Sequence, residues 1–171
     1  KLSEILEKEN IDGLLISNLT NIRYISGFTG SAGTCLVTNK GSFFITDGRY
    51  IEQSKNQVKG FKRYIDMSSH LEIIKKNNLI FDGMKIGFEA DHVNFTLYES
   101  MLNTFPNIKW EGTKMILENL ASVKDQTELD AIRVAVEITD KVYEEILPML
   151  RPGYTEKQVA NTLVSKYREY G

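Results

Sequence analysis

The sequence is poor in the residues that build disulfides and soft metal sites. It has one cysteine and two histidines in 171 residues. A single cysteine cannot form an internal disulfide, and Cys35 stands in an apolar, β-branched stretch, so we expect a buried structural thiol and a reducing, cytoplasmic localisation. His70 and His92 lack an H-x-x-E-H motif and a partner histidine at helical spacing. Surface or capping roles are therefore predicted for both.

Long apolar runs and blocks of one charge are also missing. No uninterrupted apolar run approaches the roughly 20 residues of a membrane helix, and no segment resembles a signal peptide. The formal net charge is -2, and no basic run exceeds two residues, as in the pair Lys75 and Lys76. We therefore expect neither a membrane nor a nucleic acid as a partner. The apolar share of 42% is ordinary for a globular protein.

A glycine-rich segment lacks the common catalytic and phosphate-binding patterns. Its run GSAG, residues 30–33, does not have the spacing of the G-x-S-x-G nucleophile motif, and no Lys-Ser or Lys-Thr pair follows as in a P-loop. Gly27, Gly30 and Gly33 do not form G-x-G-x-x-G either. This segment is therefore predicted to be a loop shaped for contact, because glycine permits close backbone approach.

Apolar periodicity predicts an α/β fold over about the first 111 residues. The alternating stretches 34–38 and 42–46 flank Asn39-Lys40-Gly41, a strong hairpin signal. The continuous apolar run at residues 13–17 predicts a central, buried strand. Further strands are expected at residues 61–66, 85–88 and 108–111, and helices at 2–10, 47–57, 71–76 and 91–103. The hairpin makes the predicted sheet mixed, with helices flanking it.

Carboxylates at predicted helix starts have two interpretations. Asp47 and Asp91 are expected to be N-caps of the helices that follow them. Glu89 and Asp91 flank one strand-to-helix junction, where capping is favoured over a catalytic carboxylate pair.

The last third of the chain differs in pattern. Residues 112–122 show no clear period and are interpreted as a linker. Asp125 with Glu128, and Thr155 with Gln158, have capping-box spacing ahead of two amphipathic helices. These helices have no further elements to cover their apolar faces, so we expect an incomplete domain. The predicted division is residues 1–116 and 117–171.

Three blocks of sequence carry a family resemblance. The stretches NIRYISGF (21–28), GSAG (30–33) and TDGRY (46–50), with the helices after Lys124, resemble the creatinase/prolidase family, and within it the Xaa-Pro aminopeptidases. The resemblance implies a ribonuclease H-like N-terminal domain followed by the opening helices of an α+β pita-bread catalytic domain. It also implies two divalent metal ions, with manganese expected, held by Asp, His and Glu ligands beyond residue 171. No catalytic and no metal-binding residue is then expected in this chain.

The resemblance further implies which residues face a partner. In similar proteins, which are expected to be homodimers, the loop matching Phe28, Thr29, Gly30 and Ser31 lies near the neighbouring subunit's cleft, where proline-containing peptides bind. Phe28 would either wall that cleft or pack in its own core. Asp47, Arg49 and Tyr50 are expected to serve as a structural motif. An Xaa-Pro dipeptidase and a non-catalytic peptide- or protein-binding module of the same fold remain alternatives.

Overall fold

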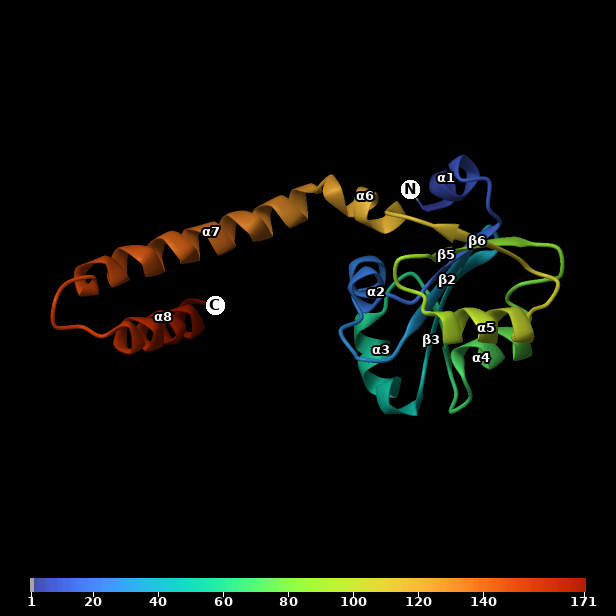
Figure 1. Ribbon diagram of the computed structural model, residues 1–171, viewed down its shortest axis with the longest axis horizontal. Helices are drawn as coiled ribbons and strands as arrows, with labels where there is room; N and C mark the ends of the chain where they lie inside the picture. The colour runs from blue at the N-terminus through green and yellow to red at the C-terminus, as the bar shows by residue number, and fades with distance from the viewer. Residues whose placement is uncertain (1) are drawn as a thin grey trace. The chain divides into compact units, whose positions relative to one another are not determined.

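The computed structural model describes residues 2–171, apart from the side chain of Ser3. The chain divides into two compact units, and the boundary in sequence falls between Ser122 and Val123. Strands of the first unit are β1 (Gly13–Ile16), β2 (Thr34–Thr38), β3 (Gly41–Thr46), β4 (Lys62–Ile65), β5 (Lys85–Glu89) and β6 (Lys109–Thr113). Its helices are α1 (Leu2–Lys8), α2 (Leu19–Ser26), η1 (Gly48–Tyr50), α3 (Ile51–Gln57), α4 (His70–Lys76), α5 (Phe95–Thr104) and α6 (Ile116–Ser122). Figure 1 shows these elements along the chain.

The strands form one mixed sheet in the order β4-β3-β2-β1-β5-β6. The pairs β1/β2 and β2/β3 are antiparallel, while β3/β4, β1/β5 and β5/β6 are parallel. The β2/β3 pair is antiparallel because a short turn can only reverse the chain, whereas strands joined through a helix, such as β3/β4 and β5/β6, can run parallel. The predicted mixed sheet flanked by helices is therefore confirmed.

The two faces of the sheet are buried under different helices. Leu15 points to a core that includes Ile74 of α4 and Met101 of α5. Leu14 and Ile16 belong to the opposite core, which also includes Leu6 (α1), Ile22 (α2), Phe28 and Leu117 (α6). Successive side chains of a strand point to opposite faces, so a strand buried on both faces is apolar throughout. The continuous apolar run of β1 follows from its central position.

One predicted helix start is wrong. Asp91 is not an N-cap, because α5 begins at Phe95 and its cap is Asn94, whose side chain accepts the Leu97 N–H at 2.9 Å. Asp91 instead lies 3.6 Å from Lys114 Nζ in an exposed ion pair. Both Asp and Asn are good caps, so composition alone could not choose between two positions three residues apart.

The linker predicted at residues 112–122 is also wrong. Gly112 and Thr113 are the last residues of β6, and residues 116–122 form α6. Leu117 is only 2% exposed and packs with Leu6 and Ile22 against the sheet. The first compact unit consequently extends to Ser122. A seven-residue helix shows too few turns for its period to stand out in sequence.

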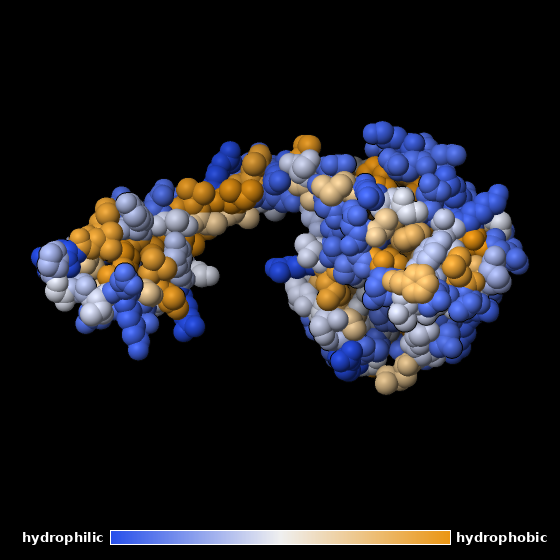
Figure 2. Space-filling view, in the orientation of Figure 1, coloured by the Kyte–Doolittle hydropathy of each residue, from blue (hydrophilic) through white to orange (hydrophobic). Residues whose placement is uncertain are grey.

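The second unit is a helical hairpin. Its elements are α7 (Gln126–Ile146), η2 (Leu147–Met149) and α8 (Glu156–Tyr170). Both predicted capping boxes are present, at Asp125 and Thr155. Val142 and Ile146 are buried, while Ile132, Val136 and Val164 stay exposed, and Figure 2 shows apolar side chains gathered on these helices. Among the described residues, no helix is long and apolar enough to cross a membrane.

Candidate functional site

The candidate loop follows directly from α2. The side chain of Asn18 caps the helix by accepting the Thr20 N–H at 2.9 Å. At the other end Gly27 has φ of 78°, in the left-handed region, and donates its N–H to the Arg23 carbonyl. A residue without Cβ adopts this conformation without strain and turns the chain out of the helix. Residues 28–31, here named the contact loop, begin at this turn.

The side chain of Phe28 anchors the contact loop from inside. It is 1% exposed, and its ring centroid lies 4.7 Å from that of Phe44 and 5.3 Å from that of Tyr50. A Cβ placed on Gly30 would come within 2.2 Å of the Phe28 ring. Any larger residue at position 30 would force the ring or the loop to shift, because the loop backbone lies directly on the ring. Of the two roles weighed for Phe28, core packing matches the structure, and its side chain does not project as a wall.

Thr29 and Ser31 are exposed and held by hydrogen bonds to the α3 region. The Thr29 N–H is donated to Gln57 Oε1 at 3.0 Å. The Ser31 N–H is donated to the Tyr50 hydroxyl at 3.3 Å, and the two hydroxyl oxygens lie 2.7 Å apart. Gln57 was not singled out from the sequence, since a glutamine near a helix end carries no motif. The loop surface is thus defined by polar contacts to side chains of the neighbouring helical segment.

A shallow hollow of about 320 Å³ lies between α2 and the contact loop. It is lined by Leu19, Thr20, Arg23, Phe28, Thr29, Gly30 and Ser31. This lining offers hydroxyls, one guanidinium and an apolar edge, but no carboxylate and no imidazole. Such a surface can contact a polar or anionic group, whereas general acid–base chemistry needs a titratable group near neutral pH.

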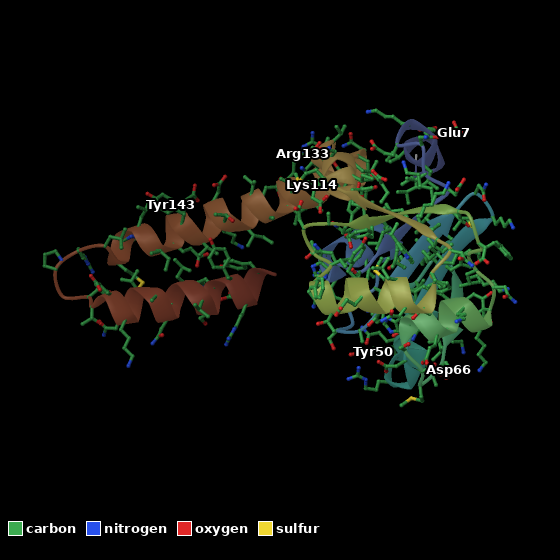
Figure 3. All side chains as sticks on the ribbon, turned by 45° about the vertical axis from the view of Figure 1, so that its right-hand side comes forward. Glu7, Tyr50, Asp66, Lys114, Arg133 and Tyr143 are labelled. Atoms are coloured by element: carbon green, nitrogen blue, oxygen red, sulfur yellow. The ribbon has the colours of Figure 1, made fainter. Side chains whose placement is uncertain are left out.

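The motif of Asp47, Arg49 and Tyr50, which follows β3, lies next to the contact loop. Asp47 caps η1 by accepting the Arg49 N–H at 3.0 Å, and the Arg49 guanidinium donates to both Asp47 oxygens at 2.9 and 2.8 Å. These hydrogen bonds from the arginine lower the pKa of Asp47 to about 2. Hydrogen bonding with Ser31 likewise lowers the pKa of Tyr50. Figure 3 shows Tyr50 at the border of the first unit. These contacts fit the predicted structural role of the motif.

The remaining titratable candidates are dispersed. His70 is half-buried with Nδ1 2.8 Å from Thr34 Oγ1, and burial lowers the pKa of its imidazole; His92 is exposed. Cys35 is fully buried, which raises the pKa of its thiol. Within residues 2–171 as described, no group of three or more His, Cys, Asp or Glu side chains could hold a metal ion.

The carboxylate of Glu89 does not cap the helix that follows it, whose cap is Asn94, but binds the backbone directly before α2. Its Oε2 accepts the backbone N–H groups of Ser17 and Asn18, at 2.7 and 2.8 Å, where α2 begins. Its Oε1 accepts the side-chain amide of Asn21 at 2.7 Å. Neither Asn21 nor the distant Glu118, which shares that amide, could be found from sequence spacing.

Comparisons with known proteins agree with this fold. The sequence model of the creatinase/prolidase N-terminal domain family matches residues 1–123 of this chain. The peptidase YqhT of Bacillus subtilis is 33% identical over the whole chain, which covers 48% of that protein.

Two solved structures each match 99% of this chain, and the match covers 48% of the length of each of those proteins. They are an Xaa-Pro dipeptidase from Bacillus anthracis (TM-score 0.88, 31% identity) and an X-Pro aminopeptidase from Thermotoga maritima (TM-score 0.82, 29% identity). The chain thus spans about half the length of these relatives. It belongs to the creatinase/prolidase N-terminal domain family.

Proposed function

We propose that this chain is the N-terminal portion of a metal-dependent Xaa-Pro aminopeptidase, which removes the first residue from peptides with proline in second position. One observation carries the proposal: the match to solved proline peptidases does not end with the N-terminal domain but continues through α7 and α8. We therefore assign Val123–Gly171 as the opening of a catalytic domain whose remainder follows in a longer protein. The exposed apolar residues of α7 and α8 support this, since they need a cover.

The contact loop is proposed to serve the catalytic cleft of a neighbouring subunit in a cytoplasmic homodimer. Thr29, Gly30 and Ser31 would provide the contacting surface, while Phe28 supports them from the core. Asp47, Arg49 and Tyr50 would hold the loop in place from η1. In a symmetric dimer such a loop acts in trans, because each subunit's loop meets the other's cleft.

Two divalent ions, with manganese as the expected metal, would activate water and polarise the scissile carbonyl in the full-length protein. The described residues hold no suitable ligand cluster, so no residue of this chain is assigned to the metals. Purified chain 1–171 is expected to release no proline-containing product from an Xaa-Pro peptide in the presence of manganese. Turnover that a chelator abolishes would contradict this assignment.

The full-length protein decides between the proposal and its alternatives. It should be assayed with manganese on an Xaa-Pro-Xaa tripeptide and on an Xaa-Pro dipeptide, before and after chelation. Metal-dependent cleavage of the tripeptide supports the aminopeptidase. Cleavage of the dipeptide alone indicates an Xaa-Pro dipeptidase, as in the Bacillus anthracis relative. Absence of both, with an intact fold by circular dichroism, favours a non-catalytic binding module.

A further inference from the structure

Three segments that are far apart in sequence meet at the side chain of Asn21. Its amide nitrogen donates one hydrogen bond to Glu89 Oε1 and one to Glu118 Oε1, both at 2.7 Å. Asn21 lies in α2, Glu89 ends β5, and Glu118 lies in α6. Asn21 is 6% exposed, although it is polar. We name Asn21, Glu89 and Glu118 the amide hub.

Both hydrogen-bond donors of the Asn21 side chain are used in the amide hub. An asparagine amide has two N–H donors, and both are taken by carboxylate oxygens. The other Glu89 oxygen accepts the N–H groups of Ser17 and Asn18, which precede the first turn of α2 and have no partner within the helix. A helix of eight residues is not stable by itself, so these bonds and the burial of Ile22 hold it on the sheet.

The position of the hub connects it to the candidate site. The chain leaves α2 at Gly27 and enters the contact loop, and it leaves α6 directly before Val123, where the second unit begins. We propose that Asn21 is a positioning residue: through Glu89 and Glu118 it fixes α2 against β5 and α6, and thereby sets the contact loop. Its consequence for catalysis rests on the proposed function, whereas its consequence for loop order does not.

This geometry can be tested by exchanging donor and acceptor in the hydrogen bond between residues 21 and 89. Asn21→Asp places a carboxylate against Glu89 and Glu118, so it removes both donors. When Asn21→Asp is combined with Glu89→Gln, the side-chain oxygen of the new glutamine can still accept the Ser17 and Asn18 N–H groups, while its amide donates to the new aspartate. The bond is then restored with donor and acceptor exchanged. Glu118 is exposed and can turn toward water, so the double variant is expected to be better ordered than Asn21→Asp.

Hydrogen exchange on chain 1–171 is the first readout. The Thr29 and Ser31 amides are expected to exchange at least about tenfold faster in Asn21→Asp, and to return toward the original rate in the double variant. Amides of Leu36 and Ile45 in the sheet should change less. The control is Asn107→Asp. Asn107 donates to Asp82 at 2.9 Å, and these residues precede β6 and β5, whereas Glu89 of the hub lies at the other end of β5.

The second readout is kinetic and uses the full-length protein. KM for an Xaa-Pro peptide should rise in Asn21→Asp and recover in the double variant, while Asn107→Asp leaves it unchanged. Unchanged loop exchange in Asn21→Asp, equal acceleration of loop and sheet amides, or a double variant that is unfolded or no better than the single would each overturn the positioning role. Altered loop exchange without any peptidase activity would uphold it and reject the proposed function alone.

Discussion

At the scale of single residues, the ring of Phe28 decides how the contact loop is built. Because Phe28 is 1% exposed, Phe28→Ala should lower the free energy of unfolding by about 3–5 kcal/mol, from lost burial and a new cavity. Phe95 is 73% exposed and gives a matched control, since Phe95→Ala should change stability little. Urea denaturation of both variants measures this. Equal stability of the two would mean that Phe28 leaves the core in solution.

The Asp47 carboxylate is the second residue-scale test. Arg49 lowers its pKa to about 2 in the folded state, against about 3.9 in an unfolded chain. The ionised form is therefore favoured by folding, and its contribution is present above pH ~4 and is lost as the pH falls through about 2.

Arg49→Gln should raise the midpoint of the Asp47 titration toward its ordinary value, as followed by NMR of the carboxyl carbon. Arg133→Gln removes a similarly exposed partner, that of Asp130, and should leave the Asp47 midpoint unchanged. A titration midpoint near the ordinary aspartate value in the original chain would show that the two-point contact does not persist in solution.

At the scale of elements, α6 is a helix that occupies residues predicted from the sequence to be a linker. If it is part of the first unit, Leu117→Ala should destabilise that unit by about 2–5 kcal/mol, because the side chain is 2% exposed. Leu102→Ala in α5 is the control, since Leu102 is 41% exposed on a helix. Denaturation followed by fluorescence of Trp110 reports on this unit. An unchanged denaturation midpoint for Leu117→Ala would indicate that residues 116–122 behave as a linker and not as part of the first unit.

At the scale of the whole molecule, the two units should differ in resistance to proteolysis. The first has a sheet buried on both faces, whereas the described part of the second is one helical hairpin. Subtilisin at low concentration is expected to cut first within Val123–Gly171 and to leave a fragment that retains α6. Mass spectrometry identifies the first product. A first cut within residues 112–122 would contradict the boundary at Ser122.

Much of this fold depends on short-range sequence features. The hairpin at Asn39-Lys40-Gly41 and the capping boxes at Asp125 and Thr155 were predictable, because turn and cap preferences act over about four residues. The apolar run of β1 predicted a central strand for the same kind of reason, since both of its faces must be covered. The resemblance to the family was also visible in the sequence, because three sequence blocks occur in the right order and their recognition requires no tertiary contact.

Only the tertiary structure decided what those residues touch. Phe28 had two open roles until the fold placed Phe44 of β3 and Tyr50 of η1 beside it. Glu89 was expected to act at the junction that follows it, yet its carboxylate binds the backbone at the start of α2, whose first residue lies 70 positions earlier in the chain. Asn21 and Glu118 are 97 residues apart, and no local spacing relates them. Propensity acts along the chain, whereas burial and hydrogen-bond satisfaction are settled by whichever segments the sheet brings together.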